Sequence, residues 1–441
     1  MATIKLKRGY DLKLLGSTSE ASPLVTAVPT TVAITPDDFT GIVPRMEKKE
    51  GEHVVAGEPL YHDKQCERIK VVAPVAGVVK EVRRGERRKI LAVIIDPDKE
   101  QPEPLKHNTA GASTLDTLLE SGLWVMLRQR PYDVVPDPDK RPRDIFVTAF
   151  DSAPLATSLM KNINPSYLER GVSALQELTD GKVYVGFAPG EEINIKGAEC
   201  NTFVGPHPAG NAGVQVANVK PVNKGEVVWT LDVVTLARIG ELFATGKVSH
   251  ETVVTLAGEQ VDEPRYVKTV CGADIQSIVG KNIKGEPEAA RIISGNVLTG
   301  NRVTTDQWLR TPYRMITVIP ENNNPDEFMG WASMSPRRFS IYHLFPAWLC
   351  GKRKVSMDAR LKGGERAIVR TGEYDRMLPM DILAEFLVKA VIAYDIDRME
   401  QLGIYEVAPE DFALAEYADT SKLELQRIIR EGLDRLRADM E

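Results

Sequence analysis

The chain has 441 residues, a formal net charge of −6 at pH 7 and a pI near 5.8; 43% of its residues are hydrophobic and 27% are charged. This length predicts about three domains, each with its own core. The acidic balance argues against bulk nucleic-acid binding, and no window reaches the roughly 20 apolar residues of a membrane span. Since the start shows no signal-peptide pattern, we expect a soluble protein that stays in the cytoplasm.

Residues 49–79 read KEGEHVVAGEPLYHDKQCERIKVVAPVAGVV, in which short β-rich runs alternate with glycines suited to tight turns. This pattern predicts a closed sandwich or barrel within residues 1–104. Domains of this kind can carry biotin or lipoate on a lysine at a hairpin tip, and Lys64 lies near the expected tip. Its neighbours in His-Asp-Lys-Gln-Cys are not the small or thioether residues that normally frame such a lysine, so we expect Lys64 to be unmodified.

A basic run follows at residues 80–89, KEVRRGERRK, with six basic and two acidic residues around Gly85. We expect it at a hairpin tip. Most charge runs are solvated surfaces. The alternative is attraction to an anionic membrane or an acidic partner, worth around 1 kcal/mol per basic residue near a membrane. The residues that would carry this attraction are Arg83, Arg84, Arg87 and Arg88.

A proline-rich link precedes the second predicted domain, residues 105–250. Ser113 and Asp116 form a capping-box pattern for a short helix that ends at Gly122. DIFVTAF and VYVGFAPG read as strands, and Pro154 is placed to begin a helix. Together these elements predict an open α/β domain.

The turns of this domain lack a Gly-x-Gly-x-x-Gly fingerprint. GPHPAGNAG, residues 205–213, is glycine-rich but has no phosphate-loop lysine, which favours a structural loop over a nucleotide site. His207 in this loop is the histidine with the best case for a ligand contact, and an unperturbed histidine titrates near neutrality.

Residues 251–327 are predicted to form a compact α+β module with the proportions of a β-grasp: a hairpin around Asp262, a short helix ADIQSIVG and further strands. Residues 328–441 are predicted to begin with an aromatic segment and to continue as helices. An apolar stripe from Leu383 to Tyr394 predicts one helix closed by Gly403, and residues 420–440 predict a last one.

The aromatic segment, residues 328–348, packs on its own core in the simpler interpretation. The other interpretation is a docking surface, because interfaces favour aromatic residues and arginine. The residues that we propose for docking or quinone contact here are Trp331, Phe339, Phe345 and Trp348. The four cysteines are too far apart in sequence to announce a zinc site or an iron–sulfur cluster.

Several segments resemble one family. SGLWVMLRQRPYDVVP, PRDIFVTAFDSAPLA, HPAGN and the stretch from LPMDILAEF to ALAEY are similar to the A subunit of the bacterial sodium-translocating NADH:quinone oxidoreductase, and the resemblance covers essentially all of the chain. It implies a peripheral subunit on the cytoplasmic side of the inner membrane, within a six-subunit complex that passes electrons from NADH to quinone and exports sodium.

The resemblance also implies that this chain binds no cofactor and has no catalytic centre of its own. FMN, FAD, riboflavin, the iron centres and the NADH site would belong to partner subunits, and this chain would lie beside the quinone-associated membrane subunit. The implied fold is a barrel-sandwich hybrid, a Rossmann-like α/β domain, an SLBB-like β-grasp module and a helical C-terminal part.

Two departures matter. The related C subunit of the Rnf complex has clustered cysteines toward its C-terminal side, whereas no cysteine follows Cys350 here. Members of the family that this chain resembles commonly show Phe-Val-Cys-Pro-Gly-Lys where this chain has Ala418 and its neighbours, so no role of that cysteine is carried over. The alternatives left open are a modified carrier domain and a stand-alone ligand-binding or nucleotide-binding protein.

Overall fold

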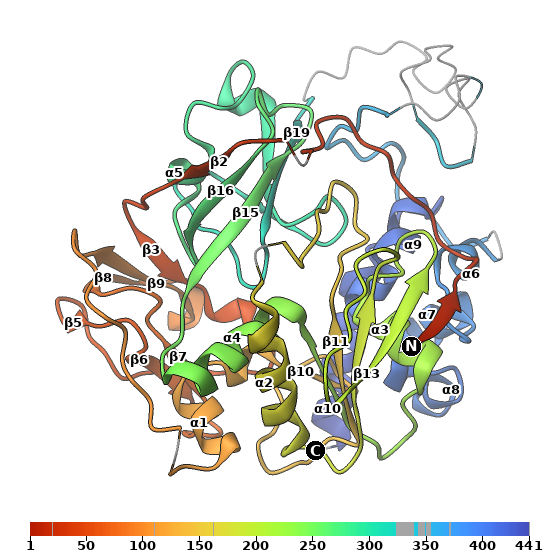
Figure 1. Ribbon diagram of the computed structural model, residues 1–441. Coiled ribbons are helices and arrows are strands. Elements are labelled where there is room, and N and C mark those ends of the chain that lie inside the picture. Colours follow the sequence, from red (N-terminus) through yellow and green to blue (C-terminus); the bar gives the residue numbers. More distant parts are fainter. Residues whose placement is uncertain are drawn as a thin grey trace.

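The computed structural model describes residues 1–440 except 20, 110, 162, 323–338, 343–348, 350–353 and 370–371 (Figure 1). Four sheets organise the described residues: a six-stranded α/β sheet, a six-stranded mixed sheet, and two small sheets of four and three strands. Trp331, Phe345 and Trp348 lie outside the described residues, so the prediction made for them stays a prediction.

The two small sheets face each other in an antiparallel sandwich, as the glycine-punctuated sequence predicts. Their strand orders are β3-β9-β8-β5 and β4-β6-β7. The strands are β3 (Val32–Ile34), β4 (Pro44–Met46), β5 (His53–Val54), β6 (Pro59–Asp63), β7 (Lys70–Val72), β8 (Gly77–Arg84) and β9 (Ile90–Pro97). Lys64 is exposed directly after β6, at the predicted turn.

The α/β sheet has the order β1-β13-β12-β11-β14-β10, with every pair parallel except β10 and β14. Its strands are β1 (Ala2–Lys5), β10 (Arg128–Arg130), β11 (Asp144–Thr148), β12 (Val183–Phe187), β13 (Ala198–Val204) and β14 (Val228–Asp232). Its helices are α1 (Thr114–Glu120), α2 (Pro165–Gln176), α3 (Ala212–Val219) and α4 (Val233–Thr245).

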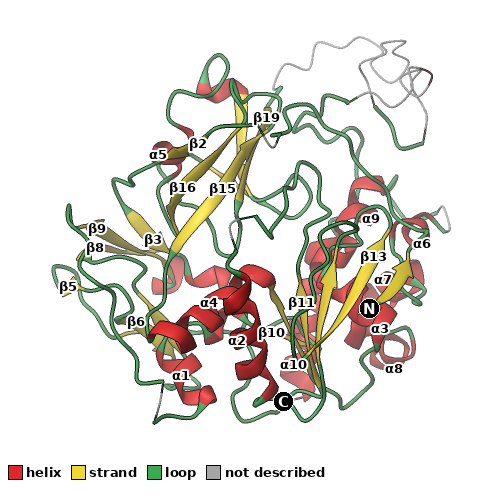
Figure 2. Cartoon of the chain, viewed as in Figure 1, coloured by secondary structure: helices red, strands yellow, loops and turns green. Residues whose placement is uncertain are grey.

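Alternate residues of the central strands face opposite layers of helices (Figure 2). Ile145 and Val147 belong to the cluster that includes α2 and α4, whereas Phe146 packs in a cluster with Val216 of α3. A strand buried on both faces therefore explains why DIFVT is apolar nearly throughout.

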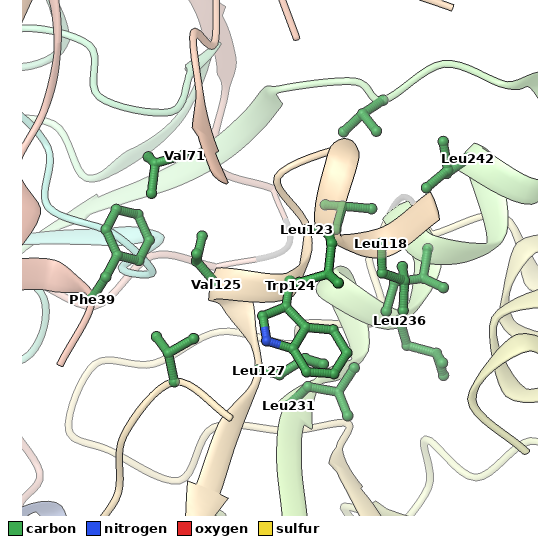
Figure 3. Packing of buried hydrophobic residues seen from close by; sticks show 14 of the residues in the cluster. Phe39, Val71, Leu118, Leu123, Trp124, Val125, Leu127, Leu231, Leu236 and Leu242 are labelled. Atoms are coloured by element: carbon green, nitrogen blue, oxygen red, sulfur yellow. The ribbon is translucent and has the colours of Figure 1, made fainter. Parts of the chain in front are cut away.

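One continuous core joins the sandwich to the α/β domain. Figure 3 shows Trp124 beside Leu127 and Leu231, with Phe39 and Val71 of the sandwich nearby. Trp124 is fully buried, and its indole N–H donates to the carbonyl of Pro136 at 2.9 Å. These two domains therefore have a shared interior.

The capping box at Ser113 is confirmed, since its hydroxyl accepts the N–H of Asp116 at 3.1 Å at the start of α1. The helix predicted at Pro154 is wrong. The next residue, Leu155, has φ +65°, which a right-handed helix does not admit, and α2 begins at Pro165 instead, capped by Asn164.

The mixed sheet has the order β18-β17-β19-β15-β16-β2. Its elements are β2 (Leu24–Thr26), β15 (Glu251–Ala257), β16 (Arg265–Val270), α5 (Ile275–Val279), β17 (Ala290–Ser294), β18 (Asn301–Val303) and β19 (Met315–Pro320). The predicted hairpin is confirmed as antiparallel β15 and β16, and the predicted helix as α5.

The C-terminal part is helical, with α6 (Glu373–Met377), α7 (Ala384–Ala393), α8 (Ile396–Gln401), α9 (Ala413–Ala418) and α10 (Leu425–Met440). The single helix predicted up to Gly403 is wrong. Tyr394 takes a left-handed conformation with φ +52°, ends α7 and lets α8 start in a new direction. Two members of the predicted apolar stripe, Leu383 and Phe386, are more than half exposed.

The first 26 residues reach across the molecule. β1 is an edge strand of the α/β sheet, where it pairs with β13, and β2 is an edge strand of the mixed sheet, where it pairs with β16. The chain enters the sandwich only afterwards (Figure 1).

Candidate functional site

The main cavity lies at the point where the strand order of the α/β sheet reverses. After β11 the chain builds β12 and β13 on one side, and then returns to place β14 on the other side of β11. Ligands of open α/β sheets bind in the crevice outside the carboxyl ends of the strands at such a point. Thr148 and Asp232, the last residues of β11 and β14, are register partners and both line a cavity of about 500 Å³.

Four parts of the chain contribute walls to this central cavity. The α/β domain supplies the strand ends and the loop with His207, and the sandwich supplies the turn with Asp38. The mixed sheet supplies Tyr313 and its neighbours, and the C-terminal helices supply Glu410. The cavity is therefore a junction that exists only when all four parts are docked.

Asp232 holds the β14 edge of the cavity in place. Its carboxylate accepts the N–H of Thr235 at 2.8 Å, which caps α4, and forms two bonds with the guanidinium of Arg314, at 2.8 and 3.1 Å. Burial alone would raise the pKa of Asp232, but Arg314 and these hydrogen bonds outweigh it and lower the pKa. Asp232 is therefore ionised at neutral pH.

Asp38 is a second buried carboxylate on the sandwich side. It pairs with Arg310 and accepts the N–H of Thr311 at 2.8 Å. Burial is the largest effect, and it raises the pKa of Asp38 to about 6 although Arg310 opposes it.

Arg130 anchors the C-terminal helices beneath the cavity. Its guanidinium is 1% exposed and contacts the carboxylates of Asp411 at 3.0 Å and Glu410 at 3.1 Å, and also the carbonyl of Glu406 at 3.0 Å. Burial, then repulsion by Asp411, raises the pKa of Glu410, while Arg130 opposes the rise. Glu410 is the member of this group that lines the cavity.

His207 is 3% exposed, and its Nδ1 lies 3.0 Å from the hydroxyl of Ser152. The same hydroxyl accepts the N–H of Gly210 at 2.8 Å, and a Cβ on Gly210 would lie 2.6 Å from the backbone nitrogen of Ser152. Burial lowers the pKa of His207 to about 4. The expectation of titration near neutrality is therefore wrong, because a buried imidazole resists protonation.

Six carboxylic acids and four guanidinium groups line the cavity, the acids being Asp37, Asp38, Asp133, Asp151, Asp232 and Glu410. Such a lining suits polar or ionic groups better than an apolar ring, for which pockets are mostly hydrophobic. Sequence reasoning missed Asp232 and Arg314. A strand that ends in Asp directly before an apolar helix was the available signal for Asp232.

The predicted basic tip is the turn between β8 and β9. Arg83 is half-buried there, paired with Glu81 at 3.1 Å and stacked 5.1 Å from the ring of Trp308. Arg84, Arg87 and Arg88 are exposed. The tip therefore presents three arginine side chains to solvent and uses the fourth for packing.

Phe339 lies elsewhere. It is half-buried, 5.9 Å from the ring of Tyr10, and packs in the cluster that holds the C-terminal helices. The structure therefore does not bring Phe339 together with the basic tip, whose packing partner Trp308 belongs to another cluster.

Within the described residues, no group of three or more His, Cys, Asp or Glu side chains is arranged to hold a metal ion. In the same part of the chain, no helix is long and apolar enough to cross a membrane.

Three family models match the chain in order. They are the NqrA N-terminal barrel-sandwich hybrid domain at residues 4–98, the NqrA second alpha/beta domain at 110–248 and the NQRA C-terminal domain at 253–305. The predicted fold class is thereby confirmed, since these descriptions agree with the sandwich, the α/β sheet and the mixed sheet.

Curated relatives match over nearly their full length. The A subunit of the Na(+)-translocating NADH-quinone reductase of Saccharophagus degradans is 35% identical over 98% of this chain and 99% of its own. The proteins of the same name from Rhodopirellula baltica and Neisseria meningitidis serogroup B are 34% and 33% identical, over 97% and 98% of both chains. A solved NAD+-reducing hydrogenase covers 75% of this chain and 62% of its own at 11% identity, and its TM-score of 0.39 is too low to support any conclusion. The chain therefore belongs to the NqrA family, the A subunits of the Na(+)-translocating NADH-quinone reductases.

Proposed function

We propose that this protein is the NqrA component of a sodium-exporting NADH:quinone oxidoreductase, a translocase that reduces quinone to quinol. The observation that carries the proposal is the end-to-end relationship at 35% identity, which leaves no domain of either chain unmatched at this scale. The described residues add that a metal cluster of this chain's own has no support.

In the proposed complex the chain is peripheral, on the cytoplasmic side of the inner membrane, and one of six subunits. It contacts the quinone-associated membrane subunit, while FMN, FAD, riboflavin and the iron centres are bound by partners. Chemistry carried by cofactors needs positioning from the protein, so a subunit without a catalytic centre is a consistent component. We retain 1–104, 105–250, 251–327 and 328–441 as proposed domain limits.

Two surfaces are proposed for docking. Arg84, Arg87 and Arg88 form a solvent-facing basic tip that suits an acidic partner or an anionic membrane. The segment with Trp331, Phe339, Phe345 and Trp348 is the proposed face toward quinone or the membrane subunit.

Purification tests the assignment. The tagged chain is extracted from its own cells' membranes in mild detergent, and co-purifying proteins are identified by mass spectrometry. Membrane subunits and flavin-bearing partners should be recovered, and deletion of the gene should abolish sodium-dependent quinone reduction by NADH. Recovery of the chain alone from intact membranes, with quinone reduction unaffected by the deletion, would refute the proposal.

The docking surfaces are tested in the same preparation. The triple variant R84A/R87A/R88A should fold normally and recover fewer partners, most clearly near 150 mM salt, where the Debye length is about 8 Å. R398A removes another exposed arginine, 74% accessible, and serves as the matched control. For the aromatic segment, unchanged assembly and quinone reduction in F345A/W348A would contradict the assignment.

A further inference from the structure

A second cavity, of about 660 Å³, lies in the α/β domain between α1, α2 and α4. Among the described residues it shares no lining side chain with the central cavity. Its apolar walls are Leu115 of α1, Leu178 after α2, Trp229 of β14 and Phe243 of α4. Walls of this kind suit a hydrophobic body.

The indole nitrogen of Trp229 marks the buried end of the cavity. Trp229 is 2% exposed, and its Nε1 has no hydrogen-bond acceptor among the described residues. Its neighbour Trp124 differs: the two rings pack edge to face at 5.0 Å, but the N–H of Trp124 donates to Pro136. A buried donor without an acceptor is costly, and each such group in a native structure calls for an explanation. An oxygen of a bound molecule would satisfy it.

The rim of the same cavity is basic. Its charged lining residues are Lys140, Arg141 and Arg170 against the single carboxylate of Glu177. Arg170 and Glu177 lie seven positions apart, two turns along the same face of α2.

The charges at this rim are unequally used. Arg141 pairs with Asp180 at 3.3 Å and donates to the carbonyl of Glu177 at 2.9 Å. Glu177 accepts the hydroxyl of Thr114. Arg170 is exposed and has no hydrogen-bond or ion-pair partner in the part of the chain that the structure describes. A guanidinium group is thus available to an anion at the mouth, above apolar walls and an unsatisfied N–H.

We propose that this cavity binds an amphipathic anion. The acidic group of the ligand lies at Arg170 and Arg141, and its apolar body packs against Leu178 and Phe243. An oxygen at its far end accepts the N–H of Trp229. The proposal is independent of membership in the respiratory complex, because it rests only on the side chains of this domain.

The test uses the full chain labelled with ¹⁵N in its tryptophans, whose five indole N–H groups each give one cross-peak. The variant W229F keeps an aromatic ring, removes the donor and identifies the Trp229 peak. The probe is ω-hydroxydodecanoate below its micelle concentration. Dodecanoate lacks the far oxygen, and dodecane-α,ω-diol lacks the charge.

The hydroxy acid should move the Trp229 peak saturably and bind more tightly than either analogue. R170A should weaken it about fivefold, the upper range for one exposed ion pair, while R398A leaves its affinity unchanged. The proposal is overturned if the Trp229 peak does not move, if the diol binds equally well, or if R170A binds like the wild type. R170A in an exposed position keeps the test valid should W229F fail to fold.

The same chemistry exists in a bilayer lipid, so phosphatidylglycerol vesicles are titrated separately. A Trp229 shift with the dissolved hydroxy acid and none with vesicles supports a small-molecule ligand. A shift with vesicles alone would overturn the proposal and assign the basic rim to membrane contact.

Discussion

Replacement of Arg130 by methionine should strongly destabilise the docking of the C-terminal helices. The change keeps the side-chain length but leaves the carboxylate of Asp411, which is 0% exposed, without its cation. Removing one partner of a buried pair costs about 3–5 kcal/mol, because the other charge remains desolvated. The double variant R130M/D411N removes the charge as well and should recover most of this loss.

The assay must be local, since a chain of several domains does not unfold in two states. Hydrogen exchange of α10 at pH 7.5 reports the opening free energy of the C-terminal part. In R130M the unpaired Asp411 has a raised pKa in the folded state, so stability falls as the pH rises through that pKa and returns as the pH is lowered. The deficit should therefore shrink between about pH 8 and pH 5.

R398M, which breaks an exposed pair worth about 0–1 kcal/mol, is the control. If R130M protects α10 as well as R398M does, or if the deficit grows at low pH, the argument from the buried pair is wrong.

Three further predictions follow from the central cavity. Because the pKa of Asp38 is raised to about 6 in the folded state, the free energy of unfolding should fall as the pH rises through about 6, and D38N should flatten that slope in thermal unfolding. His207, with a pKa of about 4, should keep a neutral ring at pH 5.5 by its ¹³C and ¹H shifts; the folded protein then loses stability below about pH 6.5, and a protonated ring at pH 5.5 would contradict this. G210A should cost about 1–3 kcal/mol because its Cβ would meet the Ser152 nitrogen, whereas G364A, with open space around it, should be neutral; equal melting temperatures would refute the packing argument.

Local signals in the sequence were sufficient where the structure is local. The cap at Ser113 depends on a contact three residues away, and the arginines of the β8–β9 turn lie where a glycine interrupts two β-rich runs. Pro154 shows the limit of such signals, because proline is permitted at a helix start but does not enforce one. The left-handed Leu155 beside it depends on tertiary packing.

The central cavity could not be predicted in the same way. Arg314 is 82 residues from Asp232, and Arg130 is 281 residues from Asp411. A single sequence contains no information on which of many arginines meets which carboxylate across such a separation. Only the strand order of the α/β sheet, with its reversal at β11 and β14, brings these side chains to one place.

The placement of β1 and β2 has a consequence for biosynthesis. These strands leave the ribosome first, yet their partners β13 and β16 are made some 200 to 260 residues later. At about 5–20 residues per second, the N-terminal segment waits on the order of ten to fifty seconds for an edge to pair with. During that time two unpaired strands are open to other chains, so the sheets of this protein are completed last by the residues that were translated first.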